Sequence, residues 1–442
     1  MPATYLGFDD TDSPQGMCTT YLATLMLGEI SDCDLVGLPR LVRLNPNVPW
    51  KTRGNAAVCL PLGHGAGQSR PCGEIDGRPV RYYAHGTPAD PDEVLEEAVS
   101  VLERVAEFDC ENTNPGVVAT NRRPSQGLYW QAVRDVVPMK RVERELKAIG
   151  ASWKGFKNGR GVIGAASSIS WRPHDRTWEV ISYREESRVG TERGISAESV
   201  VDMDRRTRHT FHNYDQDNGH VAICPASPCP VLFGIRGDDP DELLSARAMI
   251  DGERPRSWLL YLTNQGTDDH VVRRRVGELR PGMSARVRAR VAEPPRSIEG
   301  GHVILRVTDG DEVDVAFYEP SGPLNRAARL LLPGDDVEVY GSVRDKPRSL
   351  NAEKMLVSSA VPAHAKRANP MCGECGKRMG SMGVGQGYRC KVCGAKAPAD
   401  AAETEPVVRG IDTGWYEPPI SSGRPLYKPV RRMSRANINN LL

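Results

Sequence analysis

The segment GFDDTDSPQGMCTTYLA, residues 7–23, decides how the rest of this sequence is interpreted. The apolar residues just before it suit a short buried strand, and this strand runs into the acidic sequence DDTD. From Met17 to Glu29 the apolar residues then recur at helical spacing, with two threonines in the first turn. The segment therefore predicts a strand, an acidic turn and a helix at the start of an α/β domain.

The acidic turn places the three carboxylates of Asp9, Asp10 and Asp12 within four residues. Their mutual repulsion is costly unless a cation or the positive end of a helix lies nearby. Mg²⁺ bound together with nucleotide phosphates is the natural counter-charge, because Mg²⁺ favours one or two carboxylates plus phosphate oxygens. The helix start supplies free N–H groups suited to phosphate, and a nearby loop supplies cations. The candidate phosphate ligands are Gly16, Thr20, Lys51 and Arg53.

Each of these residues also has an ordinary structural interpretation. Aspartate is common in turns, and threonine near a helix start is commonly a cap. The cations and amides of the loop RLNPNVPWKTRGN, residues 43–55, are compatible with a plain turn. The residues alone leave the functional and the structural interpretation open.

The order of strand-like and helix-like segments predicts a multidomain protein of α/β and α+β class. Residues 1–125 alternate strands at 35–44 and 55–62 with a helix at 92–108, as in an α/β domain. Residues 126–272 repeat the pattern on a smaller scale, with a helix at 137–150, a glycine-rich turn at 154–167 and strands at 178–184 and 256–262, which favours a βαβ-type, ferredoxin-like domain. Residues 273–362 contain about five short strands separated by Gly, Pro and Asp, as in an OB-fold barrel. Such barrels often bind single-stranded nucleic acid, although a purely structural role is also possible.

Two CxxC pairs near the C-terminus predict a metal site within residues 363–400. The spacing of two knuckles separated by fourteen residues matches a zinc ribbon, and a closed site of four thiolates makes the zinc structural. A redox role would not need two matched pairs. The predicted ligands are Cys372, Cys375, Cys390 and Cys393. The other seven cysteines are scattered singly, which argues against a disulfide framework.

Charge is unevenly distributed along the chain, although its net value is only +1. From Lys366 to the end there are thirteen Lys/Arg against six Asp/Glu, so the preceding 365 residues are mildly acidic. A basic module of this kind, including a C-terminal tail at 401–442, suits a polyanion such as RNA, or is simply a solvated tail. No apolar run reaches the ~18–20 residues that span a bilayer, and the N-terminus lacks the features of a signal peptide. We expect a cytoplasmic protein without membrane contact.

Taken together, these motifs resemble the archaeal isoleucine-tRNA 2-agmatinylcytidine synthetases, the TiaS family. The resemblance covers nearly the whole chain and includes two long, unusual segments at 7–23 and 43–58. Shorter matching segments are NTNPGVV at 112–118, KGFKNGRGVIGAAS at 154–167, SPCPVLFGIRG at 227–237, TNQGTDDH at 263–270 and the terminal zinc ribbon. The family's kinase-like, ferredoxin-like, OB and zinc-ribbon modules follow the same order.

The resemblance implies a specific reaction. Agmatine replaces the 2-oxygen of the wobble cytidine in the CAU anticodon of the minor isoleucine tRNA, so that the tRNA decodes AUA. ATP is consumed to AMP, and its γ-phosphoryl group activates the 2-oxygen before the amine displaces phosphate. The resemblance assigns Mg²⁺ and the ATP phosphates to Asp9, Asp10 and Asp12, and autophosphorylation to Thr19. For agmatine we expect an acid or several carbonyls, and the candidates are Asp215 and Arg236.

Two other functions remain to be weighed against this one. A non-catalytic RNA-binding protein would use the barrel and the zinc ribbon but would leave the acidic turn without a role. A small-molecule kinase or ligase would act without RNA and would tolerate loss of residues from Lys366 onward. The sequence indicates neither the protein partners nor the residues that contact the anticodon.

Overall fold

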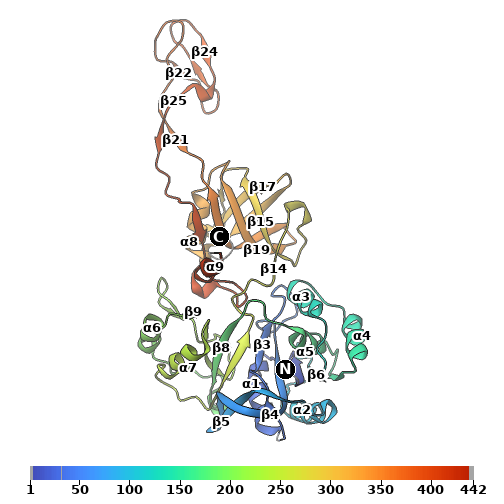
Figure 1. Cartoon of the computed structure of the whole chain (residues 1–442). Helices are drawn as coiled ribbons and strands as arrows, with labels where there is room; N and C mark the ends of the chain where they lie inside the picture. Colours follow the sequence, from blue (N-terminus) through green and yellow to red (C-terminus); the bar gives the residue numbers. More distant parts are fainter. Residues whose placement is uncertain (1–2, 31, 438–442) are drawn as a thin grey trace.

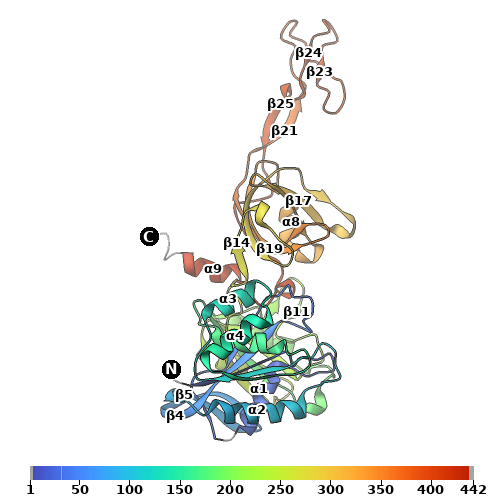
Figure 2. The same ribbon diagram turned by 90° about the vertical axis from the view of Figure 1, so that its right-hand side faces the viewer.

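The computed structural model describes residues 3–30 and 32–437, with side chains described to residue 433. Three parts lie in a row along the molecule (Figure 1). We call residues 3–270 the body, residues 271–360 the barrel, and residues 363–407 the arm. A fourth segment, the strap at residues 411–432, returns from the arm across the barrel to the body (Figure 2).

One mixed sheet runs through the body. Among the described residues it has the order β7-β6-β1-β4-β3-β13-β8-β12-β9, with β2 and β5 attached to β4. The first strand, β1, lies between β4 and β6 and pairs antiparallel with both. The strands are β1 Thr4–Asp9, β2 Asp34–Leu35, β3 Arg40–Arg43, β4 Ala56–Ile75, β5 Arg78–Thr87, β6 Gly116–Thr120, β7 Ser152–Gly155, β8 Thr177–Tyr183, β9 Thr210–Phe211, β12 Val231–Gly237 and β13 Ser257–Thr263.

Helices cover both faces of this sheet, and each face has its own apolar core. Buried side chains of α1 and α2 form one core with the sheet, whereas those of α3, α4 and α5 form another. Helices α6 and α7 extend the first of these cores beside β8 and β12. The helices are α1 Thr19–Glu29, α2 Pro91–Val105, α3 Gln126–Arg134, α4 Met139–Ile149, α5 Gly161–Ser170, α6 Ala197–Arg206 and α7 Pro240–Ala248. Among the described residues no helix is long and apolar enough to cross a membrane.

Most of the predicted elements of the body are present, including the strand at Thr4–Asp9 and the helix at Thr19–Glu29. Two segments differ from expectation. The strand expected at 55–62 continues to Ile75, because it pairs beyond Leu62 with β5. The glycine-rich stretch expected as a turn continues into α5, whose small residues let it lie close against β1. The strands expected in a second domain join the same sheet as the first, through the pairing of β13 with β3.

The barrel is closed by five strands, as expected for residues 273–362. The pairs run in a ring, because β15 contacts both β19 and β17, and β18 pairs with β17 and with β20, which returns to β19. Alternate side chains fill the barrel interior, as in β15 with its buried valines and exposed arginines. These strands are β15 Ser284–Val291, β17 Val303–Thr308, β18 Glu312–Phe317, β19 Asp336–Arg344 and β20 Ser349–Ser359. Helix α8, Pro323–Arg329, packs against the barrel.

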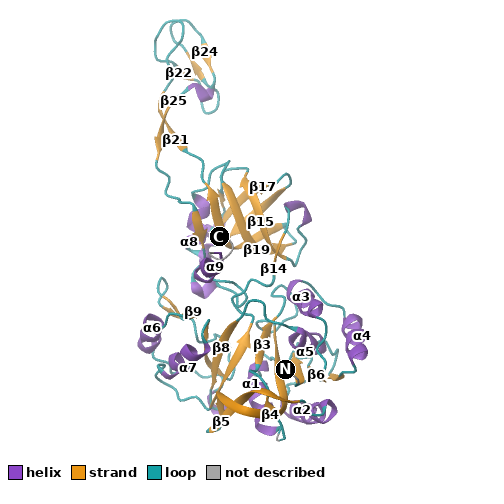
Figure 3. Ribbon diagram, viewed as in Figure 1, coloured by secondary structure: helices purple, strands orange, loops and turns teal. Residues whose placement is uncertain are grey.

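The arm consists of an antiparallel two-stranded stalk and a small lobe that is mostly loop (Figure 3). The stalk pairs β21, Ala363–Ala368, with β25, Glu403–Val407. The lobe holds a three-stranded sheet of β22 Gly380–Ser381, β23 Tyr388–Arg389 and β24 Lys396–Ala397. After the stalk, the strap adds β26, Gly414–Tyr416, to the barrel edge at β20 and then enters α9, Val430–Asn437, at the body.

Candidate active site and zinc centre

The acidic turn forms the floor of a cavity of about 160 Å³ in the body. Strand β1 ends at Asp9, and Asp10 adopts the left-handed conformation with φ +59°, which is uncommon for a residue with a side chain. This turn directs the three carboxylates into one space instead of along the strand. The wall residues with polar side chains include Asp9, Asp10, Asp12, Thr19, Lys51, Arg53, Asn55, Asp135 and Arg160.

Burial raises the pKa of Asp9 well above its ordinary value, and the charges of Asp10 and Asp12 raise it further. The pKa of Asp10 is also raised, again chiefly by burial, although the bonded Arg160 acts in the opposite direction. The cluster therefore holds more negative charge than its surroundings neutralise. A divalent cation bound by these carboxylates would relieve this cost, so the donor set fits Mg²⁺.

Two arginines hold the acidic turn in place. Arg160 lies 2.6 Å from Asp10 as an ion pair, and it also donates to the carbonyls of Asn112 and Trp50. Arg53 donates from Nε to Asp12 at 3.2 Å and from Nη2 to the carbonyl of Met17. Arg53 was among the candidates from sequence, whereas Arg160 was missed, although it stands in the glycine-rich stretch KNGRG.

Thr19 is buried at the first position of α1, and it does not act as the cap of this helix. The cap position is Cys18, which makes no side-chain capping bond. The Thr19 hydroxyl donates to Asp12 Oδ1 at 3.0 Å and accepts from the Thr11 hydroxyl at 3.0 Å. The Thr19 backbone N–H donates to the same Asp12 oxygen at 2.7 Å. Asp12 is thus placed to accept the proton of this hydroxyl.

The other candidate phosphate ligands occupy different positions. Lys51 lines the first cavity, where its amine donates to the carbonyl of Pro46. Gly16 is buried, and its N–H already donates to Ser13 Oγ. The Thr20 hydroxyl lies 3.2 Å from Cys18 Sγ and faces a second cavity. The structure therefore places Lys51 and Arg53 at the cavity of the acidic turn. Gly16 and Thr20 were expected to bind phosphate there, but the N–H of Gly16 is already bonded and Thr20 lines the other cavity.

A second cavity, of about 310 Å³, lies against the other side of Thr19. The two cavities share one wall, made by Asp12, Thr19, Arg53, Gly54 and Ala56. The far side of the second cavity includes Glu179, Arg236 and the irregular stretch of residues 222–229. The hydroxyl of Thr19 therefore lies between two spaces, each large enough for part of a substrate.

The polar groups of the second cavity centre on Glu179, which is 4% exposed. Its carboxylate accepts from Arg236 Nε at 3.1 Å and from the amide of Gln265. Sequence reasoning missed Glu179, because nothing in the strand TWEVISY marks its one carboxylate as part of a site. Asp215, expected beside Arg236, instead lies in a separate cavity and accepts hydrogen bonds from Asn218 and Ser421.

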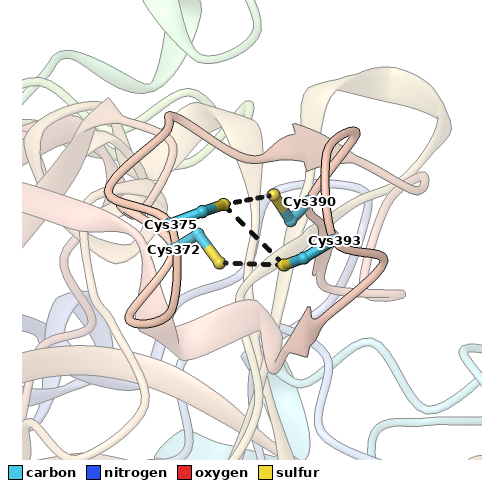
Figure 4. A group of neighbouring side chains, drawn as sticks. All are labelled: Cys372, Cys375, Cys390 and Cys393. Carbon is cyan, nitrogen blue, oxygen red and sulfur yellow. Dashed lines mark hydrogen bonds between the residues drawn. The ribbon is translucent and has the colours of Figure 1, made fainter.

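The four predicted cysteines converge in the arm (Figure 4). Their sulfur atoms all lie within 4.8 Å of one another, with Cys372–Cys393 at 3.5 Å and Cys375–Cys390 at 3.3 Å. Tetrahedral Zn²⁺ with Zn–S bonds of about 2.3 Å requires S–S separations of about 3.8 Å, so the site fits zinc. All eleven cysteines lie among the described residues, and none of them forms a disulfide.

Comparisons with known proteins agree along the chain. Residues 5–158 match the family model described as the TiaS TCKD domain, residues 159–270 the TiaS FLD domain, and residues 369–411 the TiaS C-terminal zinc ribbon domain. The isoleucine-tRNA 2-agmatinylcytidine synthetase TiaS of Methanocaldococcus jannaschii is 37% identical over 97% of this chain and 98% of the relative. The protein of the same name from Methanosarcina mazei is 38% identical over 98% of both chains.

Solved structures show the same similarity. A complex of TiaS with its isoleucine tRNA and ATP superposes with a TM-score of 0.82 at 35% identity, covering 98% of both chains. A complex of TiaS with the same tRNA, AMPCPP and agmatine superposes with a TM-score of 0.79 at 33% identity, again over 98% of both chains.

Proposed function

This chain belongs to the TiaS family of isoleucine-tRNA 2-agmatinylcytidine synthetases, and from this membership we propose how its two cavities divide the reaction. The chain is an enzyme, a ligase that uses ATP to join agmatine to the minor isoleucine tRNA and form agmatidine. Its substrates are therefore a nucleotide, a polyamine-like cation and a large polyanion. The acidic turn with Mg²⁺ suits the nucleotide, the second cavity offers the buried carboxylate Glu179 to the cation, and the basic arm suits the polyanion.

The first cavity is proposed to hold the ATP phosphates. Asp9, Asp10 and Asp12 would hold Mg²⁺, which supplies charge neutralisation for phosphoryl transfer when bound. Lys51 lies in the wall of this cavity, where its ammonium can contact a phosphate. Arg53 keeps Asp12 oriented toward Thr19 and adds positive charge beside it.

Thr19 is proposed to accept the γ-phosphoryl group. Its oxygen forms a bond to the γ-phosphorus, the bond from that phosphorus to the β–γ bridging oxygen breaks, and ADP leaves; cleavage of the α–β bond of this ADP by water then gives the expected AMP and phosphate. The hydroxyl proton passes to Asp12, whose Oδ1 lies 3.0 Å away. A threonine that sits in the wall between both cavities can be phosphorylated from one side and face the second substrate from the other.

The second cavity is proposed to receive the wobble cytidine and agmatine. A cytosine 2-oxygen is a poor leaving group. Transfer of the phosphoryl group from Thr19 to this oxygen breaks the bond between phosphorus and the Thr19 oxygen and restores the hydroxyl, and the amine of agmatine then displaces the 2-oxygen as phosphate. Glu179 is the buried carboxylate of this cavity and suits a guanidinium or amine cation. Arg236, which pairs with Glu179, would set the orientation of this carboxylate. The cytidine must leave its stack to enter this space.

The finer domain names are proposed on the same grounds. Residues 1–125 would be the kinase-like part and 126–272 the ferredoxin-like part, although one sheet joins them. The modules that follow would be the OB-fold barrel, the zinc ribbon and the tail from residue 401 onward.

The observation that carries the proposal is the position of Thr19, bonded to Asp12 between the two cavities. The test incubates purified protein with ATP, Mg²⁺, agmatine and a CAU-anticodon tRNA transcript, and measures the mass of the wobble nucleoside. Wild-type protein should convert cytidine to agmatidine. Thr19→Ala should lower the rate by at least about 100-fold, because the phosphoryl acceptor is lost.

Thr24→Ala is the matched control, since Thr24 is buried one turn further along α1 and its hydroxyl bonds to the carbonyl of Tyr21. This variant should keep most of the activity. Unmodified cytidine with the wild-type enzyme would contradict the function, and the RNA-binding alternative then predicts no ATP turnover. Normal product from Thr19→Ala would remove only Thr19 from the mechanism.

A further inference from the structure

The far wall of the second cavity is an irregular loop, residues 222–230, between β11 at His220–Val221 and β12. A loop without helix or strand bonds needs other partners for its backbone carbonyls. It packs against a second irregular segment, residues 184–196, which follows β8. The shape of the cavity depends on how these two segments are held together.

A single guanidinium holds most of the loop. Arg193 Nε donates to the carbonyl of Val231 at 2.9 Å, and Nη1 donates to that of Pro225 at 2.7 Å. Nη2 donates to the carbonyls of Ser227 at 2.8 Å and Cys229 at 3.2 Å. Four carbonyls within seven residues thus converge on one planar cation, and each bond is charge-assisted.

A second arginine fixes the backbone that leads to Arg193. Arg184 is fully buried and forms a bidentate pair with Glu253, at 2.8 and 2.6 Å. The same guanidinium donates to the carbonyls of Thr191 at 2.8 Å and Glu192 at 2.9 Å. The backbone just before Arg193 is therefore anchored, which fixes where its guanidinium enters the loop.

The loop also reaches the turn that precedes Thr19. A Cβ built on Gly16 would lie 3.2 Å from the carbonyl oxygen of Pro228 and 3.1 Å from Val189. The loop and the 184–196 segment therefore both pack against the turn that leads into α1. Arg193 is absent from the cavity wall itself, since the wall on this side consists of loop residues such as Cys224, Ser227 and Cys229.

We infer that Arg193 is a positioning residue for agmatine and the wobble base. The hydrogen bonds from its guanidinium to four backbone carbonyls hold the loop at 222–230 in the shape that closes the pocket proposed for these substrates. This inference rests on the proposed role of the second cavity. The first cavity contains none of the loop residues. We therefore expect ATP binding and phosphorylation of Thr19 not to depend on the hydrogen bonds of Arg193.

The test compares Arg193→Ala and Arg193→Lys with wild type in two assays. The KM for agmatine should rise by about 10-fold or more in Arg193→Ala, because several charge-assisted bonds that order the loop are lost. Transfer of label from γ-³²P-ATP to Thr19, measured without agmatine and tRNA, should stay at the wild-type level. Arg193→Lys keeps the charge but not the planar fork, so its KM should lie between the two.

Chemical rescue separates positioning from simple loss of stability. Guanidinium chloride at millimolar concentration should lower the agmatine KM of Arg193→Ala toward the wild-type value, because the free ion can occupy the same carbonyls. The same concentration of sodium chloride should not. Arg188→Ala, an exposed arginine on the same segment, is the matched control and should behave as wild type in every assay.

Failure of this inference is distinguishable from failure of the proposed function, because wild-type product formation and Thr19 labelling report the latter. A normal agmatine KM in Arg193→Ala would overturn the inference. Equal loss of Thr19 labelling and of agmatine binding would also overturn it. If Arg193→Ala does not fold, Arg193→Lys provides the test: a folded Arg193→Lys with the wild-type KM for agmatine would also overturn the inference.

Discussion

At the scale of single residues, the buried side chain of Asp9 lowers the stability of the fold when it is ionised. Its pKa is raised by burial and then by the neighbouring carboxylates, so the folded protein resists its ionisation. A folded-state pKa above the unfolded value of about 4 means that stability falls as pH rises past that value. The loss continues until the carboxyl also ionises in the folded protein. Because neutral pH lies above the unfolded value, the metal-free protein carries a penalty there that is absent below about pH 4.

Asp9→Asn should for this reason stabilise the metal-free protein while damaging catalysis. We expect the Tm at neutral pH, with chelator present, to rise by about 2–4 °C, and the gain to shrink near pH 4. Agmatidine formation should fall by about 100-fold or more, because a carboxylate proposed to hold Mg²⁺ is lost. Thermal unfolding at the two pH values and the tRNA mass assay provide the measurements.

Asp109→Asn controls for this prediction, since Asp109 is exposed and lines neither of the two cavities. It should change neither Tm nor activity appreciably. A lower Tm for Asp9→Asn at neutral pH would show that the carboxylate is stabilised where it lies, contrary to the prediction.

At the scale of elements, the approach of α5 to β1 decides where the acidic turn points. Glycines on β1 and on the neighbouring strand β6 make the contact possible: a Cβ on Gly7 of β1 would lie 2.4 Å from the carbonyl oxygen of Ala165, and one on Gly116 of β6 would lie 1.9 Å from the backbone nitrogen of Val162. On α5, a Cβ on Gly164 would lie 1.7 Å from Asp9 Oδ2. The helix therefore forms one wall of the first cavity and leaves room for the Asp9 side chain.

Gly164→Ala should consequently displace the Asp9 carboxylate. We expect a loss of about 1–3 kcal/mol in the free energy of unfolding from overpacking, together with a large fall in activity. Denaturant unfolding and the tRNA mass assay measure the two effects.

Gly28→Ala is the matched control, because Gly28 lies in α1 and a Cβ there meets nothing within 4 Å. It should be neutral or stabilising by up to about 1 kcal/mol, with normal activity. Full activity in Gly164→Ala would mean that Asp9 does not need its present position.

Elements were easier to predict from sequence than their contacts. The strand at Thr4–Asp9 and the helix at Thr19–Glu29 follow from apolar periodicity, which is a local property. Helix α5 was missed because GRGVIGAAS consists of small residues with weak amphipathic pattern, and it is buried by a sheet contact instead. The long pairing of β4 with β5 was missed because the outer half of β4 is mostly exposed, contains Gly65, Gly67 and Pro71, and lacks the alternation of apolar and polar residues that marks a strand.

At the scale of the whole molecule, the strap ties the C-terminal end of the chain to the body. Leu426 is 2% exposed and belongs to the apolar core on the α5 face of the sheet. Arg432 is buried between the body residues Asp175, at 3.0 Å, and Asp238, at 2.8 Å. Arg424 donates to Asn47 in the loop that carries Lys51 and Arg53. The chain segment beyond the zinc ribbon is thus part of the structure that supports the active site.

Arg432→Ala should destabilise the protein by about 1–3 kcal/mol, because it removes a buried guanidinium that bonds to the partly exposed carboxylates of Asp175 and Asp238. Urea unfolding followed by fluorescence measures this loss. Arg205→Ala, an exposed arginine on the body, should have little effect by comparison. A stability change in Arg432→Ala no larger than that of Arg205→Ala would show that the strap is only loosely attached.

The sequence by itself determined the acidic turn, the four zinc ligands, the barrel strands and the family. The turn and the cysteine pairs depend on residue types at short spacing, and short spacing constrains geometry directly: the two cysteines of a CxxC pair, or three carboxylates in four residues, cannot lie far apart. The cysteines converge as predicted, whereas the catalytic roles of Asp9, Asp12 and Thr19 stay predictions.

Only the tertiary structure decided which distant side chains complete the site. Arg160 reaches Asp10 across 150 positions, Glu179 meets the cavity behind Thr19, and Arg193 holds a loop more than thirty residues further on. Such contacts arise from the packing of α5 on β1 and from the joining of β8 and β13 to the first sheet. Because these arrangements follow from long-range burial of apolar surface, no local pattern around Arg160, Glu179 or Arg193 could have predicted their partners.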